Sequence, residues 1–475
     1  MVVQAADAAK ALVRIHDLAG RPRGTGFLAD LDGTLLTSHE AVDGLARLVL
    51  HGAAGRTCAV GADAVTPLPE SGLALVRTTG LGVPPLPVAA GRPGPGTEVR
   101  LYVDGVRDAA RVIGRAAVVY TATDRRHQLP DAVELAVPGP AGEALRLGGP
   151  AVGGLVTDAG TGAVLAVAGT ALHCGRRAGS TGVLAYASGE GTSAWPGEAG
   201  PEAVPRGFAI PLHAAAAADP RGPLAALLAR NAATVPAYGP DLNLAGVLAL
   251  TTTAMGTAGG PGPWREPVER PDVAEEFAAF GACAAVAEPV AGAVAGAAGA
   301  SAGTPVGVPA ARVLALVGDP GTGRSTELAA LAARRARAAA PAPTLRLRGA
   351  DLRAADRGLR DAVGRTLRSA GRVLSASGPA PGDPAAATPE EVAGLARAAG
   401  RPLLVLLDGP EELPPDLARR LADWTRDTAE WLHGAGARLV VACRPEYWET
   451  AGALFPAAAF LHRRVARPVQ EGGGE

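Results

Sequence analysis

The chain has 475 residues, with 45 Lys and Arg against 46 Asp and Glu, and a formal net charge of −1. This balance gives no excess of positive charge for nucleic acid, and we expect no nucleic-acid partner. The length exceeds that of one ordinary domain and predicts two or three, and a hydrophobic content of 48% indicates that each domain buries a core.

The cysteines and the apolar segments indicate the cellular compartment of the protein. The four cysteines are far apart and lack the spacing of a zinc site, which favours reduced thiols in the cytoplasm; they are Cys58, Cys174, Cys283 and Cys443. The N-terminus carries Asp7 and lacks the apolar core of a secretory signal. Residues 290–303 are rich in Ala and Gly but short, so we interpret them as a linker and expect no membrane contact.

The first part of the chain, residues 1–215, has the pattern of an all-β domain. From residue 13 onward, short apolar segments such as LVRIHD, GTGFLAD, LALVRT, EVRLYV, GVLAYA and GFAIPL alternate with Gly and Pro turns. Many short strands with a turn about every ten residues favour a barrel or a sandwich.

Residues 24–39, GTGFLADLDGTLLTSH, resemble the start of a trypsin-like serine protease domain, in which a G-[TS]-G-F strand leads to a second strand that ends in the catalytic histidine. The resemblance covers about residues 13–212. It implies a double β-barrel, with His39 as the remnant of the general base.

The other two members of the triad are missing from the matching positions. Gly72 stands where the aspartate belongs, in SGLALVR, and Leu147 stands where the serine belongs, in LRLGGP. Leucine offers no oxygen to attack a carbonyl, so we expect serine protease activity to be absent. Substitute acids would be Asp131, which is too near the nucleophile position, or Asp63 and Glu70, which require an altered strand register.

Residues 216–308 read as a helical and Ala/Gly/Pro-rich connecting region. The segment 223–231 predicts a short helix that packs on the barrel domain. The segment 269–287 places Val273, Phe277 and Phe280 near helical spacing, which predicts a linker helix that docks on the next domain.

Residues 309–475 begin with a strand, a glycine-rich turn and a helix start, RVLALVGDPGTGRSTEL. The turn fits the phosphate-binding pattern G-x-x-x-x-G-K-[ST], except that an arginine replaces the lysine. Its members are Gly318, Asp319, Pro320, Gly321, Thr322, Gly323, Arg324, Ser325 and Thr326. A guanidinium is bulkier and flatter than an ammonium and predicts altered nucleotide binding, although Lys10 is the only lysine of the chain and a general drift to arginine also explains the exchange.

The strands and helices that follow alternate, which predicts a parallel doubly wound sheet, the α/β fold of P-loop NTPases. The strand LLVLLD ends in Asp408, an acid that with Ser325 would hold Mg²⁺ beside the phosphates of ATP or another nucleoside triphosphate. The stretch LLVLLDGPEEL resembles the Walker B motif of NACHT-like and other STAND signalling ATPases. That resemblance implies that Glu411 or Glu412 polarises the attacking water.

A second stretch, RLVVACRPE, resembles the following strand of the same class. The resemblance implies that Arg444 meets the γ-phosphate, while the polar sensor is replaced by Cys443 or Ala442. The chain ends soon after this strand, so we expect a truncated ATPase core that lacks the segments that follow it in the class.

The sequence therefore predicts a cytoplasmic signalling or defence-type protein. A protease-like domain without its triad would bind a peptide or a protein partner, and an ATPase core, at most weakly hydrolytic, would act as the switch and oligomerise on nucleotide binding. Two alternatives remain open: an active trypsin-like serine peptidase with a regulatory ATPase domain, and a decayed, inactive fragment.

Overall fold

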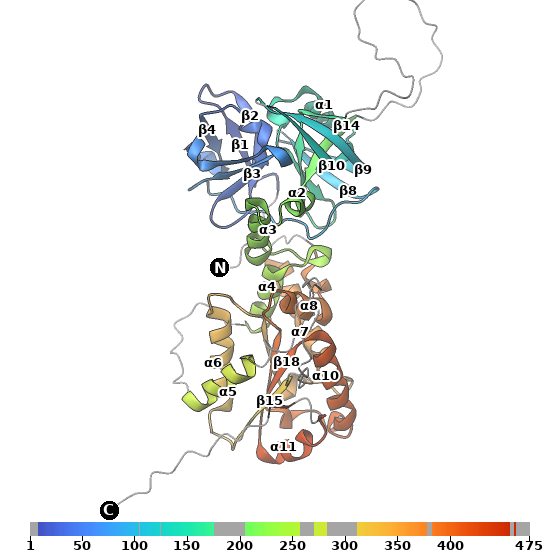
Figure 1. The fold of residues 1–475 in the computed structure, drawn as a ribbon. Coiled ribbons are helices and arrows are strands. Elements are labelled where there is room, and N and C mark those ends of the chain that lie inside the picture. The colour runs from blue at the N-terminus through green and yellow to red at the C-terminus, as the bar shows by residue number, and fades with distance from the viewer. Residues whose placement is uncertain are drawn as a thin grey trace, which may run out of the picture. The chain divides into compact units, whose positions relative to one another are not determined.

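The computed structural model describes residues 8–103, 105–123, 125–174, 205–256, 270–282, 311–377, 382–456 and 460–461. The predicted strand at 182–187, most of the predicted linker and the C-terminal end lie outside these residues. The chain forms two compact units, Met1–Ala245 with Gly378–Gly382, and Gly246–Ser377 with Asp383–Glu475 (Figure 1). No helix in the described ranges has the length and apolarity to cross a membrane.

The first unit begins with an antiparallel sheet of seven strands in the order β5-β4-β1-β2-β3-β7-β6. The strands are β1 Leu12–His16, β2 Pro22–Leu28, β3 Thr34–Ser38, β4 Arg47–His51, β5 Thr57–Gly61, β6 Val65–Leu68 and β7 Leu73–Arg77. The central strands carry the fully buried side chains of Ile15, Phe27 and Leu36, whereas the outer strands β5 and β6 are partly exposed. Burial therefore concentrates in the middle of the sheet.

A second antiparallel sheet of the same unit closes on itself, because β9 pairs with both β8 and β10. Its strands are β8 Glu98–Val103, β9 Val106–Thr121, β10 Arg126–Ala136, β11 Leu155–Asp158, β12 Val164–Gly169, β13 Leu172–Cys174 and β14 Arg206–Pro211, with helix α1 Pro140–Leu147 inserted after β10. The two sheets share one apolar cluster, so the predicted β architecture with two sheet systems is present.

Three helices follow the barrel: α2 Leu212–Ala218, α3 Pro223–Thr234 and α4 Leu244–Ala254. Leu224, Leu227 and Leu228 of α3 belong to the same apolar core as the first sheet, as the sequence predicted for this helix. The first compact unit therefore continues beyond residue 215, where the sequence placed the end of the β domain. The sequence did not predict α4, because its run of apolar residues and threonines lacks a clear helical stripe.

The second unit contains a parallel sheet in the order β16-β17-β18-β15-β19. Its strands are β15 Val313–Val317, β16 Thr344–Arg348, β17 Leu404–Asp408, β18 Arg438–Cys443 and β19 Phe460–Leu461. Each connection between strands contains at least one helix: α6 Arg324–Arg337, α7 Leu359–Ser377, α8 Pro389–Ala398, α9 Pro415–Ala418, α10 Leu421–Ala435 and α11 Pro445–Gly452. This is the alternation that predicted a parallel sheet.

Helices cover both faces of this sheet. Figure 1 shows α5 (Pro271–Ala282) and α6 on one side of β15 and β18, and α7 and α10 on the other. Phe277 and Phe280 of α5 pack in a cluster with β15, β17 and β18, which is the docking expected of this helix. Because both faces are covered, neighbouring residues of β17 such as Val405 and Leu406 are both fully buried.

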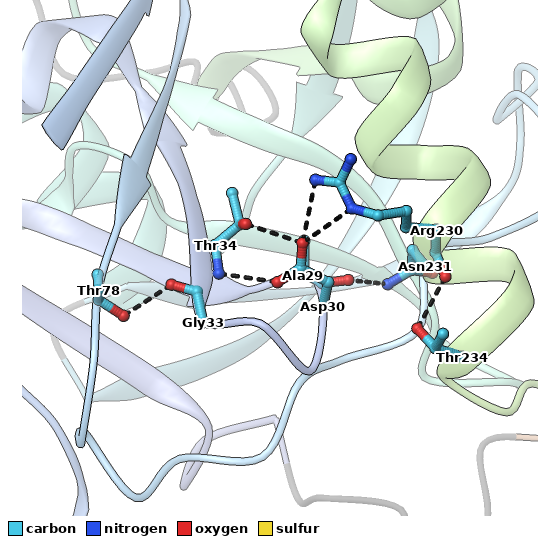
Figure 2. A network of polar contacts seen from close by, with 8 residues as sticks. All are labelled: Ala29, Asp30, Gly33, Thr34, Thr78, Arg230, Asn231 and Thr234. Atoms are coloured by element: carbon cyan, nitrogen blue, oxygen red, sulfur yellow. Dashed lines mark hydrogen bonds and ion pairs between the residues drawn. The ribbon is translucent and has the colours of Figure 1, made fainter.

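A polar network fixes α3 to the first sheet (Figure 2). The buried amide of Asn231 donates to the carbonyl oxygens of Ala29 and Leu86, at 2.7 and 2.9 Å, and accepts from the N–H of Val88 at 2.9 Å. The preceding residue, Arg230, reaches the carboxylate of Asp30 at 3.2 Å. Asn231 thus satisfies three backbone groups that strand pairing leaves unused.

We predict that Asn231→Ala lowers the free energy of unfolding of the first unit by about 3 kcal/mol, because it leaves three buried backbone groups without partners. Thr234→Ala on the same helix is the matched control, since its exposed hydroxyl contacts only the carbonyl of Arg230. Hydrogen exchange read by mass spectrometry should show faster exchange around Ala29 and Val88 in the first variant. Equal exchange in both variants would contradict this role of Asn231.

Candidate functional site

His39 is the residue of the first unit that the protease resemblance singles out. It begins a short 3-10 turn after β3, and its backbone N–H donates to the carbonyl of Gly72 at 2.8 Å. Its ring is 7% exposed, and Nδ1 lies 2.7 Å from the hydroxyl of Tyr120 on β9. The group that orients this histidine is therefore a phenol on the second sheet.

Position 72, where the triad aspartate would stand, is a glycine with a left-handed backbone. Gly72 has a φ of 68°, and a Cβ built there would lie 2.7 Å from Cδ1 of Ile210 and 3.1 Å from Cδ1 of Leu129. Of the substitute acids, Asp131 lies 3.9 Å from Arg115 on the outside of the barrel. The left-handed backbone at position 72 favours glycine, and the two nearest atoms are the ends of flexible side chains.

Leu147 is the last residue of helix α1, and it is 72% exposed. Ala141 and Leu145 anchor this stretch as a helix in the core of the closed barrel, a helix that the sequence did not predict. The segment that packs beside β2 and β3 comes a few residues later. The carbonyl of Val152 accepts from the N–H of Thr25 at 2.8 Å, and neither Val152 nor its neighbour Gly153 carries a hydroxyl.

Glu40, directly after His39, is a residue that the sequence reasoning missed. Its carboxylate accepts from the N–H groups of Thr170 and Ala171, both at 3.0 Å, and from the Thr170 hydroxyl. Its position beside the histidine was a usable signal. These contacts hold the carboxylate at the turn between β12 and β13.

In the second unit, the glycine-rich turn between β15 and α6 has the conformation that its glycines permit. Gly321 and Gly323 have φ values of 85° and 79°, in the left-handed region that favours glycine. At Gly318 a Cβ would lie 2.8 Å from the hydroxyl of Thr322, which itself donates to the carbonyl of Asp319 at 2.8 Å. Pro320 and Thr322 are exposed, so the turn faces solvent just before the first turn of a 14-residue helix.

The ends of three adjacent strands meet at this turn. The hydroxyl of Ser325 donates to Oδ1 of Asp408, the last residue of β17, at 2.9 Å. The N–H of Gly318 donates to the carbonyl of Cys443 at 3.2 Å, which joins the turn to the end of β18. The structure thus brings together Ser325, Asp408 and the β18 end, residues that the sequence assigned to one site.

Two arginines share one carboxylate at this edge. Nη2 of Arg324 lies 3.8 Å, and Nε of Arg444 3.3 Å, from Oε1 of Glu411. Nη1 of Arg324 and Oε2 of Glu411 are buried and have no hydrogen-bond partner. Glu412 and Thr326 are exposed, so Glu411 is the acid of the predicted pair that belongs to the cluster.

Arg346 on β16 is the second residue that the sequence reasoning missed. Its Nη2 lies 2.6 Å from Oδ2 of Asp408. The alternating segment TLRLR predicted the strand correctly, but it gave no sign that this arginine reaches the acid at the end of the neighbouring strand.

A scan against protein-family models and a search of curated proteins gave no match. Similar solved structures include the Rv3671c protease from M. tuberculosis in its active form, with a TM-score of 0.31 and 19% identity over 49% of this chain and 86% of that one. The MamO protease domain from Magnetospirillum magneticum has a TM-score of 0.30 and 14% identity, over 44% of this chain and 96% of its own.

A serine endoprotease from Yersinia pestis has a TM-score of 0.29 and 13% identity, over 46% of this chain and 64% of its own. All three are proteases by name.

The thiol of Cys443 gives a test of the packing beneath the glycine-rich turn. The side chain is fully buried, and burial, with the Glu411 carboxylate adding to it, raises the pKa of the thiol from 9.0 to about 12. The unfolded chain therefore loses this proton at lower pH than the folded chain. The contribution of this thiol to the free energy of unfolding is fully present below pH 9, and it is lost as the pH rises from 9 towards 12.

At pH 8 we predict that a maleimide labels the exposed Cys174 at least about a hundred times faster than Cys443, because only accessible thiolate reacts. Peptide mass spectrometry after timed labelling measures both rates in one sample, and denaturant should equalise them. Comparable rates in the folded protein would show that Cys443 is not buried.

Proposed function

We propose that the second unit binds a nucleoside triphosphate at the edge where β15, β17 and β18 end, and that this site acts as a switch for a partner-binding first unit. The observation that supports the proposal most is the 2.9 Å hydrogen bond from Ser325 to Asp408, which joins a phosphate-binding turn to an acid at a strand end. Ligands of open parallel sheets bind outside the carboxyl ends of the strands.

The residues present fit phosphate. Three glycines leave the turn open to an anion, and the N-terminus of α6 adds N–H groups without helical partners. Nη1 of Arg324 is a buried donor that makes no hydrogen bond, and a phosphate oxygen is an acceptor that a guanidinium binds well. Arg444 presents a second guanidinium from the end of β18.

Hydrolysis by this site would be weak. Glu411 is the acid near the turn, but both Arg324 and Arg444 lie within ion-pair distance of its Oε1. The two guanidinium groups compete with an attacking water for the oxygens of this carboxylate. We therefore propose that the switch responds to whether a nucleotide is bound more than to its hydrolysis.

We predict that Arg324→Ala weakens binding of a fluorescent ATP analogue by about ten- to a hundredfold, since it removes charge-assisted hydrogen bonds to phosphate. Arg372→Ala, at an exposed position of α7, is the control and should bind like the wild type. Absence of binding by the wild-type protein would refute the proposed function.

The first unit offers free strand edges to a peptide partner. Among the described strands of its first sheet, β5 pairs with β4 alone and β6 with β7 alone. An extended peptide adds to such an edge through backbone hydrogen bonds, and this mode of binding needs no nucleophile. We propose a peptide or protein partner for this sheet.

A peptidase with a regulatory ATPase domain is the second candidate, and the protease names of the similar structures agree with it better than with a sensor. The residues around His39 argue against it, because Tyr120 contacts Nδ1 and neither Gly72 nor Leu147 supplies a carboxylate or a hydroxyl. We therefore predict no covalent labelling of the full-length protein by a fluorophosphonate probe, with or without ATP. Labelling that His39→Ala abolishes would establish the peptidase instead.

A further inference from the structure

Arg346 occupies the position next to the acid that would serve a metal ion. Its Nη2 donates to Oδ2 of Asp408 at 2.6 Å, while the other oxygen, Oδ1, accepts from Ser325 at 2.9 Å. The side chain of Asp408 is 13% exposed and that of Arg346 is 29% exposed, so water competes little for this ion pair. Both oxygens of the carboxylate therefore already have a partner within the protein.

The sheet determines this contact. Strand β16 pairs in parallel with β17, with Arg346 opposite Leu406 and Arg348 opposite Asp408. The flanking residues Leu345 and Leu347 are buried, so the pleat directs Arg346 to the other face of the strand. From there its long side chain reaches Asp408, which lies two residues beyond the residue opposite Arg346.

A magnesium ion does not fit these residues well. Mg²⁺ binds through one or two carboxylates together with phosphates and waters, in nearly ideal octahedral geometry. Asp408 is paired with Arg346, and Glu411 is paired with Arg324 and Arg444. Among the described residues, no group of three or more His, Cys, Asp or Glu side chains is arranged to hold a metal ion.

The charge balance of the cluster favours an anion. The cluster consists of the guanidinium groups of Arg324, Arg346 and Arg444 and the carboxylates of Asp408 and Glu411, so three positive and two negative charges leave one positive charge. Arginine keeps its charge at every physiological pH. A buried Nε of Arg346 and a buried Nη1 of Arg324 also lack hydrogen-bond partners.

We propose that this site binds the phosphates of a nucleotide without a divalent cation, and that Arg346 supplies the positive charge that Mg²⁺ would otherwise bring to Ser325 and Asp408. The proposal rests on the proposed nucleotide-binding function. Arg324 in the turn and Arg346 on β16 both depart from the expected pattern. In this site their guanidinium groups would together neutralise the phosphates.

The test is a titration of full-length protein with a fluorescent ATP analogue, in EDTA and in excess Mg²⁺. We expect the dissociation constant of the wild type to differ by less than about threefold between the two conditions. Arg346→Ala should lose about tenfold or more of its affinity in EDTA and recover part of it in Mg²⁺, because the freed Asp408 becomes able to support a metal.

Arg348→Ala is the matched control, since it lies on the same strand, is exposed and pairs with Asp351. Arg346→Gln, which keeps a polar side chain but removes the charge, guards against a loss of folding, and thermal unfolding checks each variant. An affinity of the wild type that falls tenfold or more in EDTA, or a variant whose metal dependence equals that of the wild type, overturns the metal-free site and leaves the nucleotide site intact. No binding of the analogue by the wild type in either condition overturns both.

Discussion

The parallel pairing of β17, β18 and β15 is the constraint on which the second unit depends. Parallel strands end at the same edge of a sheet, so a turn after β15, an acid at the end of β17 and an arginine after β18 are brought together although they are far apart in the sequence. The hydrogen bonds from Ser325 to Asp408 and from Gly318 to Cys443 hold the edge together. The strand register therefore determines which charged side chains lie in the cluster.

In the first unit, apolar packing determines which groups surround His39. His39 is buried beside Tyr120, and Gly72 packs against Ile210 with a left-handed backbone that favours glycine. Replacing the glycine by an aspartate would therefore strain the backbone and require Ile210 to move. The domain keeps a protease-like arrangement of sheets, and among its described strands we propose the edges at β5 and β6 as the binding surface for an extended chain.

Much of the second unit could be predicted from the sequence, because its signals are local. Apolar runs without alternation located β15 and β17, and the order of turn, acid and arginine predicted which residues meet. The pairing of Arg346 with Asp408 could not be predicted, since it joins residues 62 positions apart and depends on a strand register that no local pattern contains. Helix α10 was also missed, although its apolar residues have helical spacing.

In the first unit the strands were predictable, whereas the site was predictable only in part. Alternation and turn residues located the strands, and the absence of a nucleophile at Leu147 was evident from residue type. Helix α1, which ends at that leucine, was not predicted. The contact of His39 with Tyr120 and the commitment of Glu40 to Thr170 depend on packing between sheets, which only the folded chain reveals.

The central claim is that phosphate binds where β15, β17 and β18 end, and hydrogen exchange measured with and without ATP tests it most directly. The account predicts slower exchange of the amides from Gly318 to Leu328 and at the ends of β17 and β18, with the strands of the first sheet as an internal reference. Unchanged exchange across the glycine-rich turn at saturating ATP would contradict it.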